Sequence, residues 1–588
     1  MRVSARNRFL TILLLHSFAL LATAQKPSPS STGNFDGPAE LPRVQVRSSL
    51  AETPTPGKTR LVHAGDNLEQ AITQAACGDT IKLEAGAVFS GRFVLPSKNC
   101  DDAHWIVIRT SAPDSALPPE GSRLTPCYAG VASLPARPAY PCPTAKNVLA
   151  RIEFPGKGTG PIEFASGANH YRLMGLEITR SATEGTIYNL ALVEPKSTAS
   201  NLVFDRVWVH GTAQSETTRG LELGGSTNVA VVDSYFSDFH CIAAAGACTD
   251  AQAIAGGTGP NPMGPYKVEN NFLEAAAEVI LLGGAGGVGP PTDIEIRRNH
   301  FFRPLTWMKD DPGFVGSADG HPFIVKNLFE LKNGQRVLFE NNVLENCWGG
   351  FSQQGFGIVL TPKNQNGNCP ECKVLDVTIR NILIRNVASG FQIANIPEGP
   401  KPPARDGGRY SIHNVLVENL DFERFHGGGA LFQINFNTVP LHDIAIDHVT
   451  VLGGKRLFTI GARPAPMKIT NFSFTNNLIG ARLLIDSPGS ASDNCSFRAD
   501  ALGPTGVLES CFSDAKFAGN VIVGAGGKWP DKNFSVKNLS DVGFVAADKE
   551  RVQNHRLGSD SRYKKAGTDQ KDVGANVDAI EAATKDAL

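Results

Sequence analysis

Residues 337–343 read VLFENNV, and this short pattern of alternating apolar and polar residues around a polar turn recurs along most of the chain. Its copies include LVFDRVWV (202–209), IEIRRNHF (294–301), VTIRNIL (377–383) and IAIDHVTV (444–451). Alternation with a period of two is typical of β-strands. The shortest step between copies is 28 residues, from Asp205 to Asp233, and the longest is 42, from Arg298 to Glu340. A constant minimum with a variable excess predicts stacked coils that carry inserted loops.

An asparagine follows most of the polar marker positions in these copies. Asparagine tolerates left-handed backbone and bonds backbone groups with its side chain, so one asparagine per coil predicts a structural ladder of bends. A β-propeller would need four strands per repeat and blade signatures, which are absent. The pattern therefore predicts an all-β chain, a single-stranded right-handed parallel β-helix of about eleven coils. The ladder positions are Asn270, Asn299, Asn341, Asn381, Asn419 and Asn476.

Together with this ladder, the two ends of the repeat region resemble the pectin lyase-like β-helix superfamily. The opening NLEQAITQAACGDTIKLEAG (67–86), with an amphipathic helix over 67–76, is similar to the N-terminal cap of that family. The closing HRLGSDSRYKKAGTDQKDVGANVDAIEAAT (555–584) resembles the C-terminal end of its secreted bacterial members. The resemblance covers residues 60–588 and implies the fold. It leaves activity open, because this fold hosts lyases, hydrolases, isomerases and non-catalytic adhesins.

Composition and the N-terminal segment indicate the compartment and exclude some partners. The 588 residues carry 56 basic and 57 acidic side chains, and the absence of a basic block excludes a nucleic-acid partner held through phosphates. Three arginines, an apolar run (Phe9–Leu21) and Ala22-Thr23-Ala24 have the layout of a cleaved signal peptide. No membrane span is expected in the mature chain, which we expect to be a secreted or periplasmic monomer. The predicted parts are a signal peptide (1–24), a Pro/Ser-rich linker (25–58), the β-helix (59–545, with the cap and first coils at 59–165) and a C-terminal cap or tail (546–588).

Eleven cysteines fit an oxidising compartment, and ten of them pair by proximity in the sequence. A zinc site is the alternative for Cys369 and Cys372, but no second Cys or His pair stands at finger spacing. Cys347 is left over, and we expect a buried thiol there. The predicted disulfides are Cys77–Cys100, Cys127–Cys142, Cys241–Cys248, Cys369–Cys372 and Cys495–Cys511.

A second strand in each coil carries the candidate site residues on one face of the β-helix. Side chains alternate along a strand, so one column should point inward: Leu331, Leu360, Ile393, Ile434 and Ile460. The neighbouring outward column reads Glu222, Ile254, Leu281, Glu330, Val359, Gln392, Gln433 and Thr459. Glu330 and Lys332 should therefore project from the middle of an exposed sheet face. Around them lie long inserts whose aromatic and polar side chains suit a sugar chain: Trp307, Trp348, Gln354 and His321.

The leading functional hypothesis is β-elimination on a polysaccharide that contains uronic acid. This reaction needs a base for the C5 proton and a cation to neutralise the carboxylate. Lys332 would be the base if Lys326 or Arg336 lowers its pKa. Glu330 would hold Lys332 or, together with Asp250, a Ca²⁺ ion.

The Glu330-Leu-Lys332 order resembles the catalytic region of the alginate/chondroitin lyase branch, but its Arg-His-Gly one coil later is replaced by Gly357–Pro362. VWVHG (207–211) resembles the pectate-lyase VWIDH without its Asp. Two alternatives therefore stay open. One is hydrolysis by paired carboxylates such as Asp310-Asp311, and the other is carbohydrate binding without catalysis.

Overall fold

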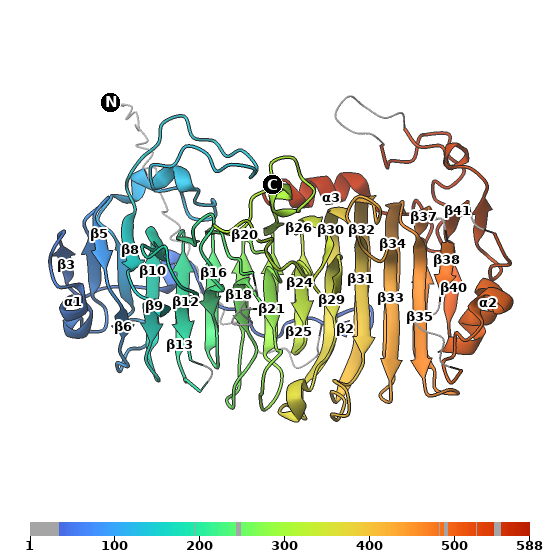
Figure 1. Cartoon of the computed structure of the whole chain (residues 1–588), viewed down its shortest axis with the longest axis horizontal. Helices are drawn as coiled ribbons and strands as arrows, with labels where there is room; N and C mark the ends of the chain where they lie inside the picture. Colours follow the sequence, from blue (N-terminus) through green and yellow to red (C-terminus); the bar gives the residue numbers. More distant parts are fainter. Residues whose placement is uncertain are drawn as a thin grey trace, which may run out of the picture. The chain divides into compact units, whose positions relative to one another are not determined.

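The computed structural model describes residues 34–194, 196–242, 249–480, 483–486, 492–524, 526–545 and 554–588. Their strands form a parallel β-helix, in which each strand pairs with its counterpart in the next coil (Figure 1). The predicted signal peptide (1–24) lies outside the described residues, as do residues 25–33 and 546–553. The chain is thus all-β in its main body, as the repeat predicts.

Three rows of strands make up the wall of the β-helix. The twelve-stranded sheet, which faces the viewer in Figure 1, contains β6 (Phe93–Leu95), β9 (Gly158–Phe164), β12 (Ile187–Val193), β15 (Arg219–Glu222), β18 (Gln252–Gly256), β21 (Ile280–Leu282), β24 (Phe329–Leu331), β29 (Phe356–Leu360), β31 (Ser389–Asn395), β33 (Ala430–Asn437), β35 (Arg456–Arg463) and β38 (Leu483–Asp486).

The other two rows are joined into one 26-stranded sheet, because β30 (Lys373–Val387), β32 (Asp406–Leu420) and β34 (His442–Leu452) run through both. The first row also contains β3 (Thr59–Val62), β4 (Thr80–Leu83), β7 (Ile106–Thr110), β10 (Asn169–Met174), β13 (Ser200–Asp205), β16 (Thr227–Val232), β19 (Tyr266–Glu269), β22 (Thr292–Arg297), β25 (Gly334–Glu340), β36 (Ile469–Thr475), β39 (Phe512–Ser513) and β40 (Lys516–Ala518). The second row also contains β5 (Val88–Ser90), β8 (Ala150–Phe154), β11 (Leu176–Arg180), β14 (Trp208–His210), β17 (Tyr235–Ser237), β20 (Phe272–Glu274), β23 (His300–Phe302), β26 (Val343–Cys347), β37 (Leu478–Gly480), β41 (Val521–Val523) and β42 (Phe534–Val536).

The interior is a continuous apolar core built from stacked columns. The predicted inward column is in register, since Leu331, Leu360, Ile393, Ile434 and Ile460 pair in turn and are fully buried. Each such side chain removes its apolar area from water, which is the dominant favourable term in folding. The same register corrects one outward position. Ala255, not Ile254, stands opposite both Glu222 and Leu281.

The structure divides the predicted asparagine ladder into three columns. At the bend between the first and second rows, nine non-glycine residues adopt φ between 49° and 58°, where asparagine is favoured. Asn299 instead lies one position further on, where its side chain bonds Asn271 and Asn342 inside the coil. Asn419 bonds Asn386 in a third column. The nine left-handed bend residues are Arg206, Asp233, Asn270, Arg298, Asn341, Asn381, Asn414, His448 and Asn476.

Two of the three described helices lie near the ends of the coil stack. The predicted helix at 67–76 is present as α1 (Leu68–Gln74), capped by Asn67, whose Oδ1 accepts from Gln70 N. Near the other end lies α2 (Ala499–Cys511), whereas the C-terminal α3 (Val577–Thr584) packs against β30 and β32 in the middle of the stack (Figure 1). Among the described residues, the helices are all too short or too polar to cross a membrane.

Two small hairpin-like pairs complete the elements: β1 (Phe35–Asp36) with β2 (Ala39–Glu40), and β27 (Gly349–Gly350) with β28 (Gln353–Gln354). Four of the five predicted disulfides are present in the described residues, and the fifth includes Cys248, which lies outside them. Cys347 is a free, buried thiol. The described disulfides are Cys77–Cys100, Cys127–Cys142, Cys369–Cys372 and Cys495–Cys511.

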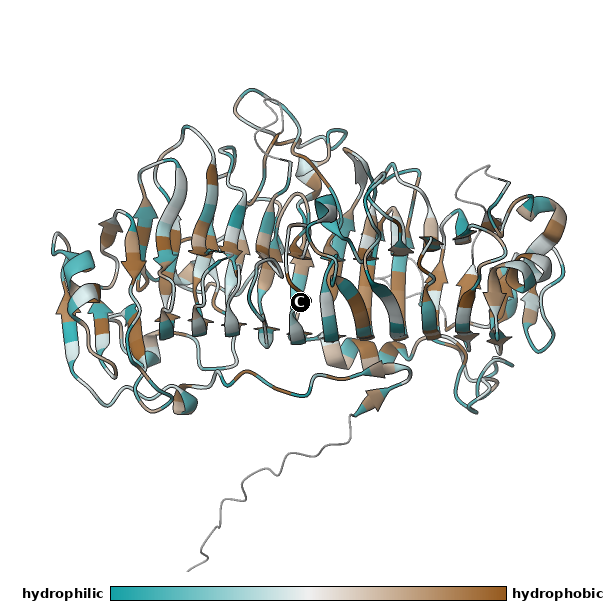
Figure 2. Cartoon of the chain, turned by 90° about the horizontal axis from the view of Figure 1, so that it is seen from below, coloured by the Kyte–Doolittle hydropathy of each residue, from teal (hydrophilic) through white to brown (hydrophobic). Residues whose placement is uncertain are grey.

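Residues 34–54, predicted as part of a linker, lie along the first row of strands (Figure 2). We call them the N-terminal strap. The strap begins beside β30 and β32, where Asp36 pairs with Arg380 and His413, and it runs back toward the N-terminal coils. At its far end Ser48, Ser49 and Thr53 accept hydrogen bonds from Arg172 on β10.

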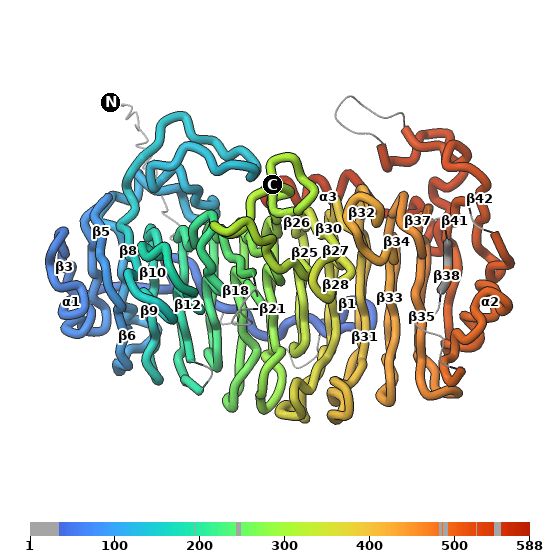
Figure 3. Tube along the Cα trace, viewed as in Figure 1, coloured from blue at the N-terminus to red at the C-terminus, as the bar shows by residue number. Residues whose placement is uncertain are grey.

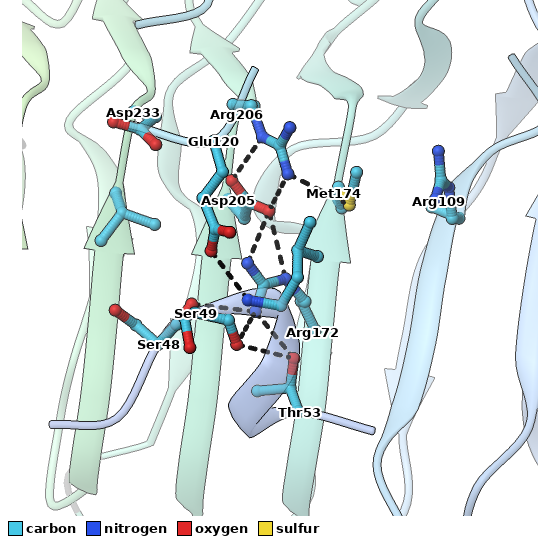
Figure 4. Close-up of polar contacts among 12 residues, drawn as sticks. Ser48, Ser49, Thr53, Arg109, Glu120, Arg172, Met174, Asp205, Arg206 and Asp233 are labelled. Atoms are coloured by element: carbon cyan, nitrogen blue, oxygen red, sulfur yellow. Dashed lines mark hydrogen bonds and ion pairs between the residues drawn. The ribbon is translucent and has the colours of Figure 1, made fainter. Parts of the chain in front are cut away.

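A buried triad of charges, Arg172, Asp205 and Arg206, fastens the strap (Figure 4). Arg172 Nη2 donates to Asp205 Oδ2 at 2.7 Å, and Arg206 Nε donates to Asp205 Oδ1 at 2.7 Å. The remaining guanidinium donors reach oxygens of Ser48, Thr53 and Pro118. Every charge of the triad thus has a partner, as a buried ion pair requires.

Other segments cover the second row. Residues 111–149 make an excursion that buries Met174, Trp208, Tyr235 and Phe272, and α3 packs on the next coils toward the C-terminus. Figure 3 shows both covers along the same edge of the coil stack. In the view of Figure 1 no helix of the described chain lies over the twelve-stranded sheet.

Candidate functional site

The strongest concentration of charge on the twelve-stranded sheet lies at its middle strands. Glu330 is on β24 and Lys332 follows that strand directly. Lys326 precedes β24, Glu278 precedes β21 and Asp250 precedes β18. We call these five side chains the lysine–carboxylate cluster. Because β18, β21 and β24 are neighbours in the sheet, residues 80 positions apart in the chain come together here (Asp250 to Glu330).

Ion pairs join the members of the cluster. Lys326 Nζ contacts the carboxylate of Asp250 and lies 3.4 Å from Glu278 Oε1. Lys332 Nζ lies 3.6 Å from Glu330 Oε1. The predicted site residues Lys326, Glu330, Lys332 and Asp250 are thus brought to one place, with Glu278 between them.

Two amide side chains donate hydrogen bonds to carboxylates of the cluster. Gln252 Nε2 donates to Glu278 Oε2 at 2.9 Å, and Asn327 Nδ2 donates to Glu330 Oε2 at 2.9 Å. Asn327 Oδ1 is buried without a hydrogen-bond partner among the described residues, and Glu278 Oε1 has the 3.4 Å ion pair with Lys326 but no hydrogen bond. Unpaired buried acceptors are costly, so they mark a place where a bound group could complete the network.

The electrostatics of the cluster keep its lysines ionised. Burial alone lowers the pKa of Lys332, but the carboxylates of Glu330, Glu278 and Asp250 together raise it above its ordinary value. Lys326 behaves alike, since Glu278 and Asp250 outweigh burial and raise its pKa. Burial raises the pKa of Glu278 in spite of the two lysines. The predicted role of Lys332 as a base required a lowered pKa, so the direction found here is opposite to that requirement.

A third lysine, Lys363, lies one coil further on. Residue 363 follows β29, and its backbone N donates to Lys332 O at 3.0 Å. Its Nζ donates to Ile396 O at 2.8 Å. Burial and the neighbouring Lys332 ammonium lower the pKa of Lys363. Of these three lysines, Lys363 is therefore the one whose pKa is lowered.

The structure separates Arg336 from the cluster. Its guanidinium forms a bidentate pair with Asp293 at 2.7 and 3.0 Å, at the corner where the first row begins. Arg336 lies on β25, in the first row beyond the bend that follows β24, and its backbone is left-handed with φ of 55°, so its side chain faces away from Lys332 although only four positions separate them.

The predicted sugar-binding tryptophans are buried. Trp307 and Trp348 are 2% and 5% exposed in an apolar cluster with Phe323 and Phe425, so neither offers a free ring face. Long apolar loops on a rigid scaffold bury their own aromatic residues, which sequence spacing does not reveal. His321 and Gln354 are exposed, and Phe351 presents its ring near Lys326, 5.7 Å from Nζ to the ring centroid.

The cluster as it stands does not fit a calcium site. Among the described residues there is no group of three or more His, Cys, Asp or Glu side chains placed to hold a metal ion. Asp250 and Glu330, the predicted ligands, are each engaged by a lysine ammonium. Calcium binds through six to eight oxygens, which two carboxylates facing lysines do not supply. Calcium use stays a prediction.

On either side of the cluster the outward column of the twelve-stranded sheet carries uncharged side chains. Toward the C-terminus it presents Gln392, Gln433 and Thr459, which are partly exposed and uncharged. Toward the N-terminus it presents Leu281 and Ala255. Positive charge on this stretch of the sheet is therefore concentrated at Lys326, Lys332 and Lys363.

Sequence reasoning missed Glu278 and Lys363. Glu278 stands in a plain Ala-Ala-Ala-Glu-Val run, and only its pairing with Gln252 across neighbouring coils shows its place. Lys363 could have been found, because it stands three positions after the end of β29, on the coil that follows that of Lys332.

No protein-family model matches this chain, and no curated protein matches it. Among solved structures it is similar to a mannuronic acid-specific polysaccharide family 6 lyase from human gut microbiota, with 11% identity, 82% of this chain and 91% of that chain covered, and a TM-score of 0.48. It is also similar to the pectate lyase Pel9A, with 13% identity, 89% and 97% coverage and a TM-score of 0.34. The catalytic domain of a GH87 α-1,3-glucanase, in complex with nigerose, has 11% identity, 81% and 70% coverage and a TM-score of 0.41. These similarities are too distant to indicate what this chain does.

Proposed function

We propose that this protein is an exported carbohydrate-active enzyme that cleaves an acidic polysaccharide by β-elimination on the twelve-stranded sheet. The observation that carries the proposal is the placement of three lysines on neighbouring coils. Lys326 and Lys332 are ion-paired with carboxylates of the cluster, and Lys363 N donates to Lys332 O from the next coil. The pKa directions of the three lysines fit these roles. β-Elimination needs both kinds of group, a cation that stabilises the uronate carboxylate and a base that removes the C5 proton.

Each lysine has a role in this scheme. Lys332, which is 21% exposed in its side chain, binds the substrate carboxylate and stabilises the negative charge that develops when the proton leaves. Lys326, 10% exposed, adds positive charge from the inner side of the cluster. Lys363 accepts the C5 proton, and the electron pair of the broken C–H bond forms the C4–C5 double bond as the C4–O bond breaks. The leaving oxygen takes a proton from water and departs as the hydroxyl of the released chain.

The carboxylates position the cations. Glu330 and Asn327 hold the Lys332 side of the cluster, while Asp250 and Glu278 hold Lys326. Gln392 and Gln433 on the following coils offer amides to sugar hydroxyls. Because coils repeat at about 4.8 Å, a polysaccharide lying along the stack would meet one coil after another.

The test is the ultraviolet absorbance of unsaturated product on pectate, alginate and glycosaminoglycans, each with added Ca²⁺ and with a chelator. We expect a rise in absorbance on at least one substrate that contains uronic acid. A flat signal on all of them in both conditions would overturn the proposal.

Glycoside hydrolysis is a second candidate because burial raises the pKa of Glu278, the property of a general acid, and Asp250 lies nearby with 33% of its side chain exposed. New reducing ends without unsaturated product would favour this reaction. Glycan binding without either product would indicate a binding protein.

A further inference from the structure

The outward column of the twelve-stranded sheet holds no cation from β6 to β35, the strands whose outward side chains the structure describes. Its members stand opposite one another from coil to coil, and all are neutral or acidic. In chain order they are Val94, Glu163, Leu192, Glu222, Ala255, Leu281, Glu330, Val359, Gln392, Gln433 and Thr459. Because coils lie about 4.8 Å apart, a polymer along the stack places successive sugars over successive members of this column.

The lysine–carboxylate cluster itself can take up little further negative charge. Its two lysines are each paired with carboxylates of the cluster, and with Lys363 included there are three ammonium groups beside three carboxylates. Burial raises the pKa of Glu278, so this carboxyl group is the one that gives up its charge most readily. The balance leaves room for one added carboxylate, which can reach Lys332 because 21% of that side chain is exposed.

Toward the N-terminus, the two carboxylates of the outward column already hold the cations beside them. Glu222 Oε2 lies 3.5 Å from Arg219 Nε, which also donates to Gln252 Oε1 at 2.8 Å. Glu163 is paired with Arg92. A second carboxylate of a bound polymer would therefore meet like charge over these coils.

Toward the C-terminus, the loops beside the sheet do not supply the missing cations. Arg405 contacts Glu371, and Arg463 on β35 donates to Asp493 at 3.1 Å. Besides Lys363, the loops that flank β29, β31 and β33 contain three Lys or Arg side chains and four carboxylates: Lys401, Arg405 and Arg424 against Glu371, Glu398, Asp421 and Glu423. Positive charge for a substrate is thus confined to the coils of β24 and β29.

Uncharged groups beside the cluster fit a neutral sugar. Phe351, at the tip of hairpin β27–β28 (Figure 3), is 63% exposed, and its ring centroid lies 5.7 Å from Lys326 Nζ. The base of the hairpin is fixed, since Gln354 O accepts from Gly428 N at 3.2 Å. An exposed aromatic ring packs on the apolar face of a sugar. The two glutamines of the outward column offer amides to sugar hydroxyls on the following coils.

We propose that this sheet selects an unsulfated acidic heteropolysaccharide, in which neutral sugars separate each uronate from the next. The inference rests on the proposed function, because it names the substrate class of the same site. The uronate at the cleaved bond places its carboxylate at Lys332, and the neutral sugar beyond it packs on Phe351. A chain with a carboxylate on every sugar, or with added sulfates, would bring negative charges over coils where no cation pairs with them, which is unfavourable.

The test compares kcat/KM for unsaturated-product formation on unsulfated chondroitin, chondroitin sulfate, pectate and alginate. In unsulfated chondroitin a uronate alternates with a neutral N-acetylated sugar. We expect its kcat/KM to exceed the other three at least about tenfold, since a charge without a partner costs about as much as one charge-assisted hydrogen bond contributes. An equal or higher value on any of the other three would overturn this inference and leave β-elimination in place. A flat signal on all four would overturn the proposed function itself.

Adding a cation to the outward column should change the preference. Gln392→Lys, and separately Gln433→Lys one coil further on, should each raise kcat/KM on pectate or alginate about tenfold relative to unsulfated chondroitin. Ser535→Lys, at an exposed position of β42 in the second row, adds the same charge elsewhere and should leave the preference unchanged. An unchanged preference in both glutamine variants, or an equal change in Ser535→Lys, would overturn the inference.

Removing the exposed ring should weaken the neutral-sugar contact. Phe351→Ala should raise KM on unsulfated chondroitin about threefold to tenfold at an unchanged melting temperature, because the ring is largely in solvent. Phe35→Ala, at a ring that is 59% exposed on the N-terminal strap, is the matched control and should leave KM unchanged. An unchanged KM in Phe351→Ala would remove the neutral-sugar contact on which the inference depends.

Discussion

Two groups of buried charge in this protein are built from similar side chains but differ in how they are completed. In the triad under the N-terminal strap, Arg172, Asp205 and Arg206 are at most 2% exposed, and backbone oxygens take up the donors that Asp205 leaves free (Figure 4). In the lysine–carboxylate cluster, Lys332 and Asp250 reach solvent and Glu278 keeps an oxygen without a hydrogen bond.

The pKa directions follow this difference. Burial raises the pKa of Asp205, but the two arginines outweigh burial and lower it. The triad is therefore stable in its charged form. In the cluster, burial dominates at Glu278 and raises its pKa. A closed network of charges serves the fold, and an open one with unpaired acceptors is suited to bind and react. The two regions should therefore respond in opposite ways to substitution.

The largest effect should come from Lys363→Met. Removing a general base costs about 10²–10⁴-fold in rate, so the rate of unsaturated-product formation should fall by that factor. The melting temperature should stay unchanged, since among the described residues the Lys363 ammonium donates a hydrogen bond to the carbonyl of Ile396, at an exposed position. Lys516→Met, at an exposed lysine on β40, is the matched control. Full activity in Lys363→Met would show that Lys363 is not the base.

Asp205→Asn should act on stability instead. It leaves two buried guanidinium groups without an anion, and breaking a buried ion pair in this way costs about 3–5 kcal/mol. Chemical denaturation measures this loss, and Asp250→Asn in the partly exposed cluster should lose less than about 1 kcal/mol. Equal losses in the two variants would abolish the distinction between the regions.

The same variant has a defined pH dependence. Because the pKa of Asp205 is lowered in the folded state, its carboxylate stabilises the fold above the ordinary aspartate pKa of about 3.9. That contribution is lost as the pH falls through the folded-state pKa. The stability difference between the unaltered protein and Asp205→Asn should therefore be largest at neutral pH and shrink below pH of about 4. A difference that grows on acidification would contradict this assignment.

A smaller effect is expected at the other end of the strap. Asp36→Ala removes the pairs with Arg380 and His413, which are partly exposed, so the free energy of unfolding should fall by about 1 kcal/mol or less. Limited proteolysis at the strap is the second readout. A loss as large as that of Asp205→Asn would show that the strap is fastened at Asp36 and not at the triad.

The smallest effect should be that of a chelator. Lysines supply the positive charge of the cluster, so removing divalent cations should change the rate by less than about twofold. Complete loss of activity with a chelator, restored by Ca²⁺, would show that the carboxylates of Asp250 and Glu330 leave their lysines to bind metal.

The fold and part of the candidate site could be predicted from local pattern. Strand alternation placed Leu331 inward and Glu330 outward, and pairing with neighbouring coils leaves both in those orientations. Period-two arguments fail where a strand bends. Ile254 is one position out of register, and Arg336 turns to another face beside Asp293.

The sequence by itself determined the coil repeat, the apolar interior and the disulfide pairs that the described residues contain, because these depend on spacing along the chain. Only the tertiary structure decided which charges meet. Glu278 reaches Lys326 across inserted loops, the strap joins residue 48 to Arg172, and Trp307 is buried. The physical reason is that loop closure lets distant segments pack at little extra entropic cost, so a contact between coils leaves no mark in the local sequence.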